Sequence, residues 1–186
     1  MSSSSLIALP TFRDGSDITV IVETTKGSRN KVDYQPELRV FELAGVLPEG
    51  SVFPYDFGFI PSTQGEDGDP LDVLILLDES VPTGCLISAR LIGVIEANQT
   101  EKDGTTMRND RILAVASRAH THSHVMHLND LRPQMTEEIE RFFVSYNESK
   151  GKRFEPLRRS GPEEALALVH AGIKRLQERS SSTSSQ

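Results

Sequence analysis

The feature that most constrains this chain is a short acidic segment that leads directly into an apolar one. Residues 67–72 read Asp-Gly-Asp-Pro-Leu-Asp, and residues 73–77 read Val-Leu-Ile-Leu-Leu. An apolar run of this length beside turn residues is typical of a buried strand. Such a strand would hold the carboxylates of Asp67, Asp69 and Asp72 on a rigid element, where they cannot separate to relieve their repulsion. Carboxylates held this close bind either a proton or a cation.

The chemistry of these side chains favours a hard metal ion. Oxygen ligands select hard divalent ions, and Mg²⁺ is the usual one. A calcium-binding EF-hand loop is excluded by position, because Leu71 stands where that loop needs an oxygen ligand and Asp72 where it needs Gly. An aspartyl-phosphate phosphatase is disfavoured, since its acids follow a strand and these precede one. The segment therefore predicts a magnesium site, with a solvated acidic turn as the alternative.

Hydrophobic periodicity divides the rest of the chain into two parts. Up to about residue 117, short β-branched and aliphatic runs separated by Gly and Pro predict strands, at residues 18–22, 38–43, 71–77, 86–95 and 112–116. After Leu128 the spacing becomes helical, with Thr136 as a candidate N-cap of the first helix and Pro162 at the start of the second. This order favours an α+β fold in which helices pack on a small barrel.

Length, charge and cysteine content limit which classes of protein this chain can belong to. A chain of 186 residues suits one domain, expected at residues 17–178 between an N-terminal tail at 1–16 and a disordered Ser-rich tail at 179–186. The net charge of −7, without a basic stripe, disfavours nucleic acid as a partner. No apolar run is long enough to span a membrane. The single Cys85 and the lack of a signal-like N-terminus predict a cytoplasmic protein.

Further motifs surround the acidic segment. Glu23 precedes the basic stretch 26–31, and Phe53-Pro54 precedes Phe-Gly-Phe-Ile-Pro at residues 57–61. Phe142-Phe143 with Tyr146 lies on the first predicted helix. With the acidic segment, these motifs resemble the soluble, Mg²⁺-dependent inorganic pyrophosphatases of family I, over about residues 20–177. The resemblance implies a closed five-stranded barrel of OB type with two main C-terminal helices. It also implies hydrolysis of pyrophosphate to two phosphates by metal-activated water.

The resemblance implies a role for each site residue. Asp69 would be catalytic, orienting or deprotonating the attacking water. The metal ligands would be Asp67 and Asp72, then Glu23 through water, the loop acid Glu101 (or Asp103), and either Asn109 as a neutral ligand or Asp110. The residues expected to contact phosphate are Lys31, Arg111 and Tyr146. Bacterial members are commonly hexamers, so the resemblance also implies a homo-oligomer.

The chain departs from the family pattern where phosphate is bound. Gly45 stands where the family places an Arg, and Arg39 is the candidate substitute. Phe53 and Phe57 stand where the family has Tyr, and Asn147 where it has Lys. Lys150 and Lys152 lie close to Asn147 in the sequence. Asp33, which follows Lys31, stands where the family has a longer Glu. Two alternatives therefore stay open: a Mg²⁺-dependent hydrolase of another phosphoanhydride, and a non-catalytic OB-type binding module.

A histidine-rich segment at residues 120–127 stands outside these motifs. His120, His122 and His124 would lie on one side of an extended segment, where they could chelate a transition metal. With His127, this segment contains four of the five His residues. The alternative is a surface loop or a subunit contact.

Overall fold

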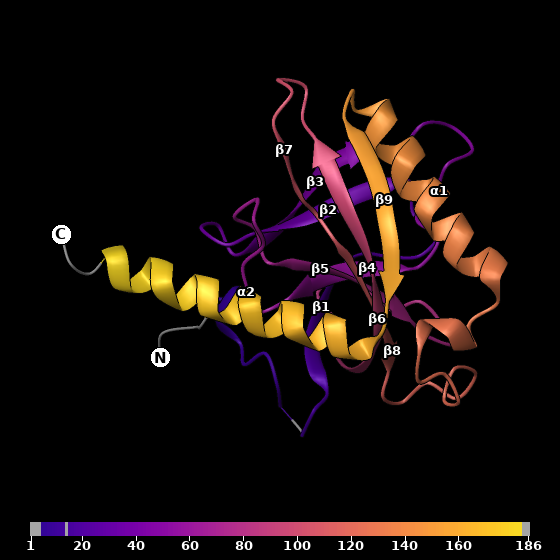
Figure 1. Ribbon diagram of the computed structural model, residues 1–186, viewed down its shortest axis with the longest axis horizontal. Helices are drawn as coiled ribbons and strands as arrows, with labels where there is room; N and C mark the ends of the chain where they lie inside the picture. Colours follow the sequence, from indigo (N-terminus) through magenta and orange to yellow (C-terminus); the bar gives the residue numbers. More distant parts are fainter. Residues whose placement is uncertain (1–4, 14, 184–186) are drawn as a thin grey trace.

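The structure is a computed structural model that describes residues 5–13 and 15–183. Its strands are β1 (Ile18–Thr24), β2 (Asn30–Gln35), β3 (Val40–Val46), β4 (Asp56–Ile60), β5 (Leu71–Leu76), β6 (Leu86–Thr100), β7 (Thr106–Arg108), β8 (Arg111–Ala116) and β9 (Arg153–Ser160). Its helices are α1 (Pro133–Ser149) and α2 (Pro162–Thr183), with short 3-10 turns η1 (Leu6–Ala8) and η2 (Leu128–Asp130). Figure 1 shows their arrangement.

Five strands hydrogen-bond in a closed ring at the centre of the molecule. β1 pairs with β4, β4 with β5, β5 with β8, β8 with β6, and β6 with β1 again. Only the pairing of β5 with β8 is parallel. This ring, accompanied by two helices, confirms the predicted α+β fold with a closed five-stranded arrangement. The apolar run that follows the acidic segment is the buried strand β5, as predicted.

The long strand β6 serves both the ring and a sheet that extends from it. Its first residues pair with β1 and β8, and its last residues pair with β7 and β9. The register shifts between Leu91 and Gly93, which bends the strand. A Cβ on Gly93 would lie 2.4 Å from the carbonyl oxygen of Ser160, and its φ is +150°, so only glycine fits there.

A hairpin of β2 and β3 forms a second, two-stranded sheet beside the ring. Arg39 closes its turn with a φ of +56°, and its N–H donates to the carbonyl of Gln35. The strand predicted at residues 38–43 is therefore wrong at its start. Residues 38 and 39 belong to the turn, and β3 begins at Val40.

The two helices pack against the extended sheet, α1 on β9 and α2 on β6 and β9 (Figure 1). α1 begins at Pro133, whose fixed φ suits a first turn. The predicted cap at Thr136 is wrong, because the Thr136 hydroxyl lies inside the helix and donates to the Pro133 carbonyl. α2 begins at Pro162, as predicted. None of the helices in residues 5–13 and 15–183 is long and apolar enough to cross a membrane.

Parts of both expected tails are structured. α2 continues to Thr183, so residues 179–183 are helical where the sequence analysis expected disorder. Near the other end, Leu6, Ile7 and Leu9 pack against a small cluster around Tyr34. Residues 1–4 and 14 of the expected N-terminal tail, and residues 184–186 of the C-terminal one, lie outside the described residues.

Candidate active site

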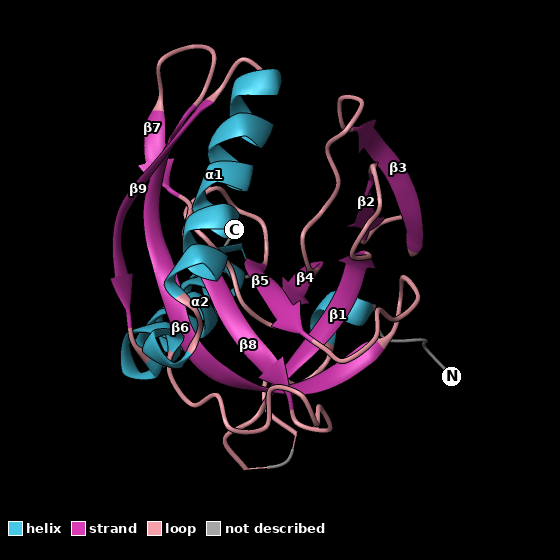
Figure 2. Ribbon diagram, turned by 90° about the vertical axis from the view of Figure 1, so that its right-hand side faces the viewer, coloured by secondary structure: helices cyan, strands magenta, loops and turns pink. Residues whose placement is uncertain are grey.

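A cleft of about 610 Å³ lies between the hairpin, the ring and α1. Figure 2 shows the hairpin and α1 standing on either side of β4 and β5. Nine of the ten predicted site residues line this cleft: Glu23, Lys31, Asp67, Asp69, Asp72, Glu101, Asn109, Arg111 and Tyr146. Acidic and basic side chains that are far apart in the sequence therefore face one space.

The parallel pairing of β5 with β8 brings the acidic segment to its main cation. Parallel strands place their first residues at the same edge of a sheet, and Asp72 and Arg111 lie at the starts of β5 and β8. An Arg111 Nη1 lies 2.7 Å from Asp72 Oδ2. Burial raises the pKa of Asp72, while Arg111 and then Lys31 act against that rise. The Asp72 carboxyl is thus held in place by a neighbouring cation.

The other two carboxylates of the acidic segment precede β5 in a loop. The Asp69 N–H donates to Asp67 Oδ1 over 3.1 Å. Burial raises the pKa of both carboxyls, and each is raised further by a neighbouring acid, Asp67 by Asp69 and Asp69 by Asp72. Repulsion among partly buried carboxylates is the condition in which a bound cation is most favourable.

Glu23 reaches the cleft because β1 bulges at this residue. Val22 faces Gly58 and Thr24 faces Phe57 across the β1–β4 pair, so one extra residue stands on β1. A bulge of this kind redirects a side chain and is common beside active sites. The Tyr34 N–H donates to Glu23 Oε1 over 2.8 Å, and burial raises the pKa of Glu23 to about 7.

Arg111 is buried against aromatic rings. Its guanidinium lies 4.7 Å from the ring centroid of Phe143 and 5.3 Å from that of Phe154. Besides Asp72, its Nη1 donates to Asn109 Oδ1. Its Nε is buried and has no hydrogen-bond partner among the described residues. Arg111 also lines the cleft, and a cation held rigidly in this way is suited to bind an anion.

Lys31 and Tyr146 face the cleft from the hairpin and from α1. Lys31 pairs with Asp33, and its Nζ lies 4.9 Å from the ring centroid of Phe57. The Tyr146 hydroxyl accepts a hydrogen bond from Lys150. Burial and the charge of Asp33 raise the pKa of Tyr146, so its hydroxyl stays protonated. It can therefore donate a hydrogen bond to an anion.

The structure separates the two candidates that the sequence left open, Asn109 and Asp110. Asn109 lines the cleft, and its amide donates to Gln99 Oε1 over 3.1 Å. Asp110 lines a neighbouring pocket instead, where it accepts from the Ala97 N–H and pairs with Arg108. Asn109 is therefore the residue of this pair that faces the acidic loop from within the cleft.

Glu101 lines the cleft, whereas its alternative Asp103 lies in an exposed turn. Glu101 accepts from Gln99 and pairs with Lys152, whose hydrogen bond lowers the Glu101 pKa. The sequence analysis missed Gln99, because the strand predicted at 86–95 ends before a polar stretch. β6 in fact continues to Thr100, and alternation along it directs Gln99 into the cleft.

The structure also shows where the residues that depart from the family pattern lie and what they contact. Gly45 pairs with Lys31 across the hairpin, its φ is not positive, and a Cβ built there meets no atom within 4 Å. Arg39 is exposed in the hairpin turn and is not among the residues that line the cleft. Asn147 is buried and donates to the Phe143 carbonyl within α1. Asn147 lines the cleft together with two cations, Lys150 and Lys152.

The histidine segment lies away from the cleft and is not extended. Its backbone forms turns, in which the Ser123 N–H donates to the His120 carbonyl and the Val125 N–H to that of His122. The expectation of an extended strand with its imidazoles on one side is therefore wrong. Asp78 accepts from the N–H groups of residues 120 and 121, and this bonding fixes the segment as a surface loop.

The donor set of the cleft fits a hard metal ion that keeps much of its water. Among residues 5–13 and 15–183, no three Asp, Glu, His or Cys side chains converge on one point. Mg²⁺ does not require such convergence, since it retains several waters and binds through one or two carboxylates. The candidate ligands are oxygen donors only, and burial, together with repulsion from a neighbouring acid, raises the pKa of Asp67 and Asp69. This chemistry favours a divalent cation of the Mg²⁺ type.

Comparison with known proteins gives consistent matches. The family model for inorganic pyrophosphatase matches residues 20–177. An inorganic pyrophosphatase of Nostoc sp. is 38% identical over 157 residues, which cover 84% of this chain and 90% of that protein. Soluble inorganic pyrophosphatase 3 of Arabidopsis thaliana is 38% identical over 135 residues, 72% of this chain and 60% of that protein.

Solved structures agree with these matches. The inorganic pyrophosphatase of Thermus thermophilus superposes with a TM-score of 0.84 at 29% identity, covering 93% of this chain and 99% of that one. That of Neisseria gonorrhoeae gives a TM-score of 0.83 at 30% identity, covering 94% and 99%. The similarity therefore spans the ring, the acidic loop and the hairpin together.

Proposed function

Since this chain belongs to the inorganic pyrophosphatase family, whose members hydrolyse pyrophosphate to two phosphates, we propose that it does so with Mg²⁺ bound in the cleft. Asp67 and Asp72 would hold the first ions and Glu23 a further one through water, with Asn109 and Glu101 completing the set. Bound Mg²⁺ neutralises phosphate oxygens and makes a bound water more acidic. The oxygen-only donors and the raised pKa values of the acidic loop support this assignment.

Asp69 is proposed as the proton acceptor. It lines the cleft between Asp67 and Asp72, and its side chain takes part in none of the ion pairs found among the described residues. Burial and the charges of Asp72 and Asp33 raise its pKa. A carboxylate with a raised pKa is a stronger base, and a base is more effective when its pKa approaches the working pH.

The substrate phosphates are proposed to bind Lys31, Arg111 and Tyr146. Pyrophosphate is strongly anionic, so it needs fixed positive charges and donors on the side of the cleft opposite the acids. Lys31 and Arg111 already hold carboxylates, Asp33 and Asp72. Lys150, whose pKa is lowered by burial and by Lys31, adds a further cation beside Tyr146.

One observation carries this proposal: the predicted acids and the predicted cations line one cleft. The direct test is phosphate release from pyrophosphate, tripolyphosphate and nucleoside di- and triphosphates, each with Mg²⁺, with Ca²⁺ and after EDTA treatment. We expect Mg²⁺-dependent release that is fastest with pyrophosphate. We expect Ca²⁺ to inhibit, because its larger radius misplaces the water. Full activity after exhaustive EDTA treatment would contradict the metal assignment.

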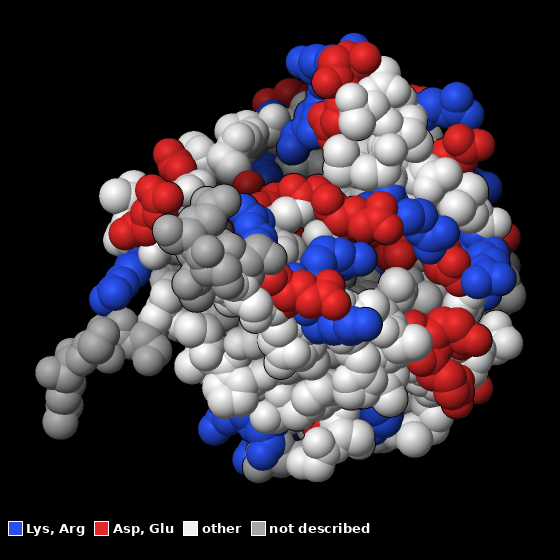
Figure 3. Space-filling view, turned by 60° about the vertical axis from the view of Figure 1, so that its left-hand side comes forward, with Lys and Arg blue, Asp and Glu red and all other residues white. Residues whose placement is uncertain are grey.

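We further propose that the chain is a cytoplasmic homo-oligomer that binds neither nucleic acid nor membrane. Figure 3 shows Lys and Arg side chains interspersed with Asp and Glu on one face, an arrangement that does not suit a phosphate backbone. Apolar side chains of the hairpin are exposed, 72% for Leu38, 58% for Leu43 and 59% for Val46. An exposed apolar cluster suits a contact between subunits. Sedimentation analysis tests this, and a monomer at micromolar concentration would contradict it.

A further inference from the structure

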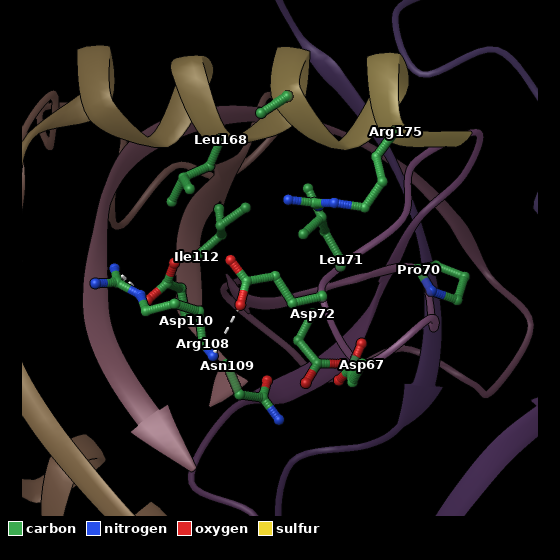
Figure 4. Close-up of a pocket in the computed structure, with 13 residues that line it drawn as sticks. Asp67, Pro70, Leu71, Asp72, Arg108, Asn109, Asp110, Ile112, Leu168 and Arg175 are labelled. Atoms are coloured by element: carbon green, nitrogen blue, oxygen red, sulfur yellow. Dashed lines mark hydrogen bonds and ion pairs between the residues drawn. The ribbon is translucent and has the colours of Figure 1, made fainter. Parts of the chain in front are cut away.

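The loop that carries the acidic residues separates the cleft from a second pocket. The cleft lies on one side of it, and a pocket of about 230 Å³ lies on the other side, beneath α2. Asp67, Pro70 and Asp72 line both. Figure 4 shows this pocket with Arg175 reaching into it from α2 above the loop. A segment with space on both faces has little packing to fix it, so its position depends on its hydrogen bonds.

Hydrogen bonds within the loop close it on itself. The Gly65 N–H donates to the Asp69 carbonyl over 2.7 Å, and the Gln64 side-chain amide donates to the Gly68 carbonyl over 2.8 Å. These bonds fix the shape of residues 64–69. They do not fix the position of the loop relative to the ring and to Arg111.

Two hydrogen bonds from α2 attach the base of the loop. The Gln64 N–H donates to the Gly172 carbonyl over 3.1 Å, and Arg175 Nη1 donates to the Gln64 carbonyl over 2.6 Å. Both backbone polar groups of Gln64 are therefore bound by one helix. Because α2 also packs on β6, its hydrogen bonds to Gln64 fix the position of the loop relative to the ring.

Gly172 allows this attachment by removing a side chain. A Cβ at this position would lie 2.8 Å from Leu71 Cδ1, 3.2 Å from Thr63 Cβ and 3.3 Å from the Gln64 carbonyl oxygen. Glycine within a helix is normally less favourable than alanine. Its presence in the middle of α2 therefore indicates that close approach of the loop matters at this point.

We propose that Gly172 and Arg175 are positioning residues that set the acidic loop for metal binding, an inference that rests on the proposed function. The role of Arg175 is carried by its hydrogen bond rather than by its charge. Arg175 takes part in none of the ion pairs found among the described residues, and the cation paired with Asp72 is Arg111. Residues that orient metal ligands from behind typically change metal affinity by about 10- to 100-fold when replaced.

The test compares Arg175→Gln and Gly172→Ala with the wild type. Lys174→Gln is the matched control, because Lys174 is an exposed cation on the same helix that pairs with Glu178 one turn further along. Mg²⁺ binding is measured by calorimetry without substrate, and amide hydrogen exchange is measured over residues 64–72. We expect both test variants to bind Mg²⁺ about tenfold more weakly and to exchange faster in the loop. The Lys174→Gln protein should match the wild type.

Stability separates positioning from folding. Alanine favours helix over glycine by about 1 kcal/mol, which offsets the cost of moving Leu71 and Thr63 away from the new methyl group. Gly172→Ala is therefore expected to keep a thermal midpoint near that of the wild type while it weakens Mg²⁺ binding. This variant also keeps the test decisive if Arg175→Gln fails to fold. Wild-type binding and wild-type exchange in either folded variant would overturn the inference. Asp72→Asn is measured alongside: unchanged Mg²⁺ binding there would refute the metal role of the loop, while the exchange data would still report on its attachment.

Discussion

The acidic loop and the β2–β3 hairpin face the same cleft but are held very differently. The loop leads into β5 in the closed ring and is bound from behind by α2. The hairpin is a separate two-stranded sheet with exposed apolar side chains. The acids expected from the family are intact on the loop, whereas the missing Arg, at Gly45, lies on the hairpin. The more strongly attached side thus carries the proposed metal ligands, and the less attached side carries the position at which the proposed phosphate contacts are altered.

The difference follows from what each side must do. A proton acceptor and a set of metal ligands work only within a narrow geometry, so they need a segment whose position is fixed, here by β5 and by the hydrogen bonds to α2. A phosphate can be held by several arrangements of cations, since lysine acts as a flexible point charge. Lys31, Lys150 and Lys152 all line the cleft, so the charge that Gly45 and Asn147 do not supply has other sources.

The largest effect is expected on the loop side, from Asp69→Asn. This change removes the proton acceptor but leaves Asp67 and Asp72, so turnover should fall by about 10²–10⁴ while Mg²⁺ binding largely persists. Stopped-flow phosphate release and calorimetry measure the two quantities. Asp72→Asn should instead weaken Mg²⁺ binding, and the exposed Asp103→Asn should change neither. A loss under tenfold at saturating Mg²⁺ would show that Asp69 is not the acceptor.

An intermediate effect is expected from Glu23, which joins the two sides because it lies on β1 and binds the hairpin N–H of Tyr34. Its pKa of about 7 means that protons compete with metal below neutrality. At pH 6 the carboxyl is mostly protonated, so this Mg²⁺ site should be about tenfold weaker than at pH 8. Glu23→Gln should weaken binding at pH 8 and abolish the pH dependence.

The control for the pH dependence is Glu101→Gln. As a proposed ligand its loss should weaken Mg²⁺ binding, but the pH dependence should persist, since the pKa of Glu101 is lowered. The same pKa of Glu23 affects stability in metal-free protein. Because the folded state binds its proton more tightly than the unfolded state, the free energy of unfolding should fall as pH rises from about 4.5 to 7. Mg²⁺ should oppose that fall. A Glu23→Gln protein with the wild-type pH profile would refute this explanation.

The smallest effect is expected on the hairpin side, from Gly45→Arg. Gly45 lies opposite Lys31, so a side chain there projects on the same face of the hairpin as Lys31, which lines the cleft. The backbone and the open space permit an arginine. A charge-assisted hydrogen bond is worth about 1.5–3 kcal/mol, and the low end applies at an open position such as this one. Since about 1.4 kcal/mol is tenfold, a rise in kcat/KM of about tenfold is expected.

Arg39→Ala is the companion variant for steady-state kinetics on pyrophosphate. Since Arg39 is exposed in the turn, its removal should leave kcat/KM unchanged. The opposite result would be a folded Gly45→Arg protein with unchanged kcat/KM and an Arg39→Ala protein with a large loss of kcat/KM. It would mean that Arg39 already provides the phosphate contact that Gly45 lacks. It would also show that the hairpin turn reaches the substrate.

Most of the site could be predicted because its residues carry short motifs with a chemical meaning. The triple-Asp segment, the buried strand after it and the start of α2 at Pro162 all follow from local pattern. The missed positions have no such local signal. Gln99 lies in a polar stretch of β6, and the turn at Arg39 interrupts a run that reads as strand.

The sequence by itself determined which groups are available: carboxylates before a buried strand, a few cations and two helices. Only the tertiary structure decided which of them meet. The parallel pairing of β5 and β8 places Arg111 against Asp72, the β1 bulge turns Glu23 inward, and the backbone after β7 directs Asn109 rather than Asp110 into the cleft. These outcomes depend on register between strands distant in sequence. Register is fixed by burying the whole core at once, and no local pattern encodes it.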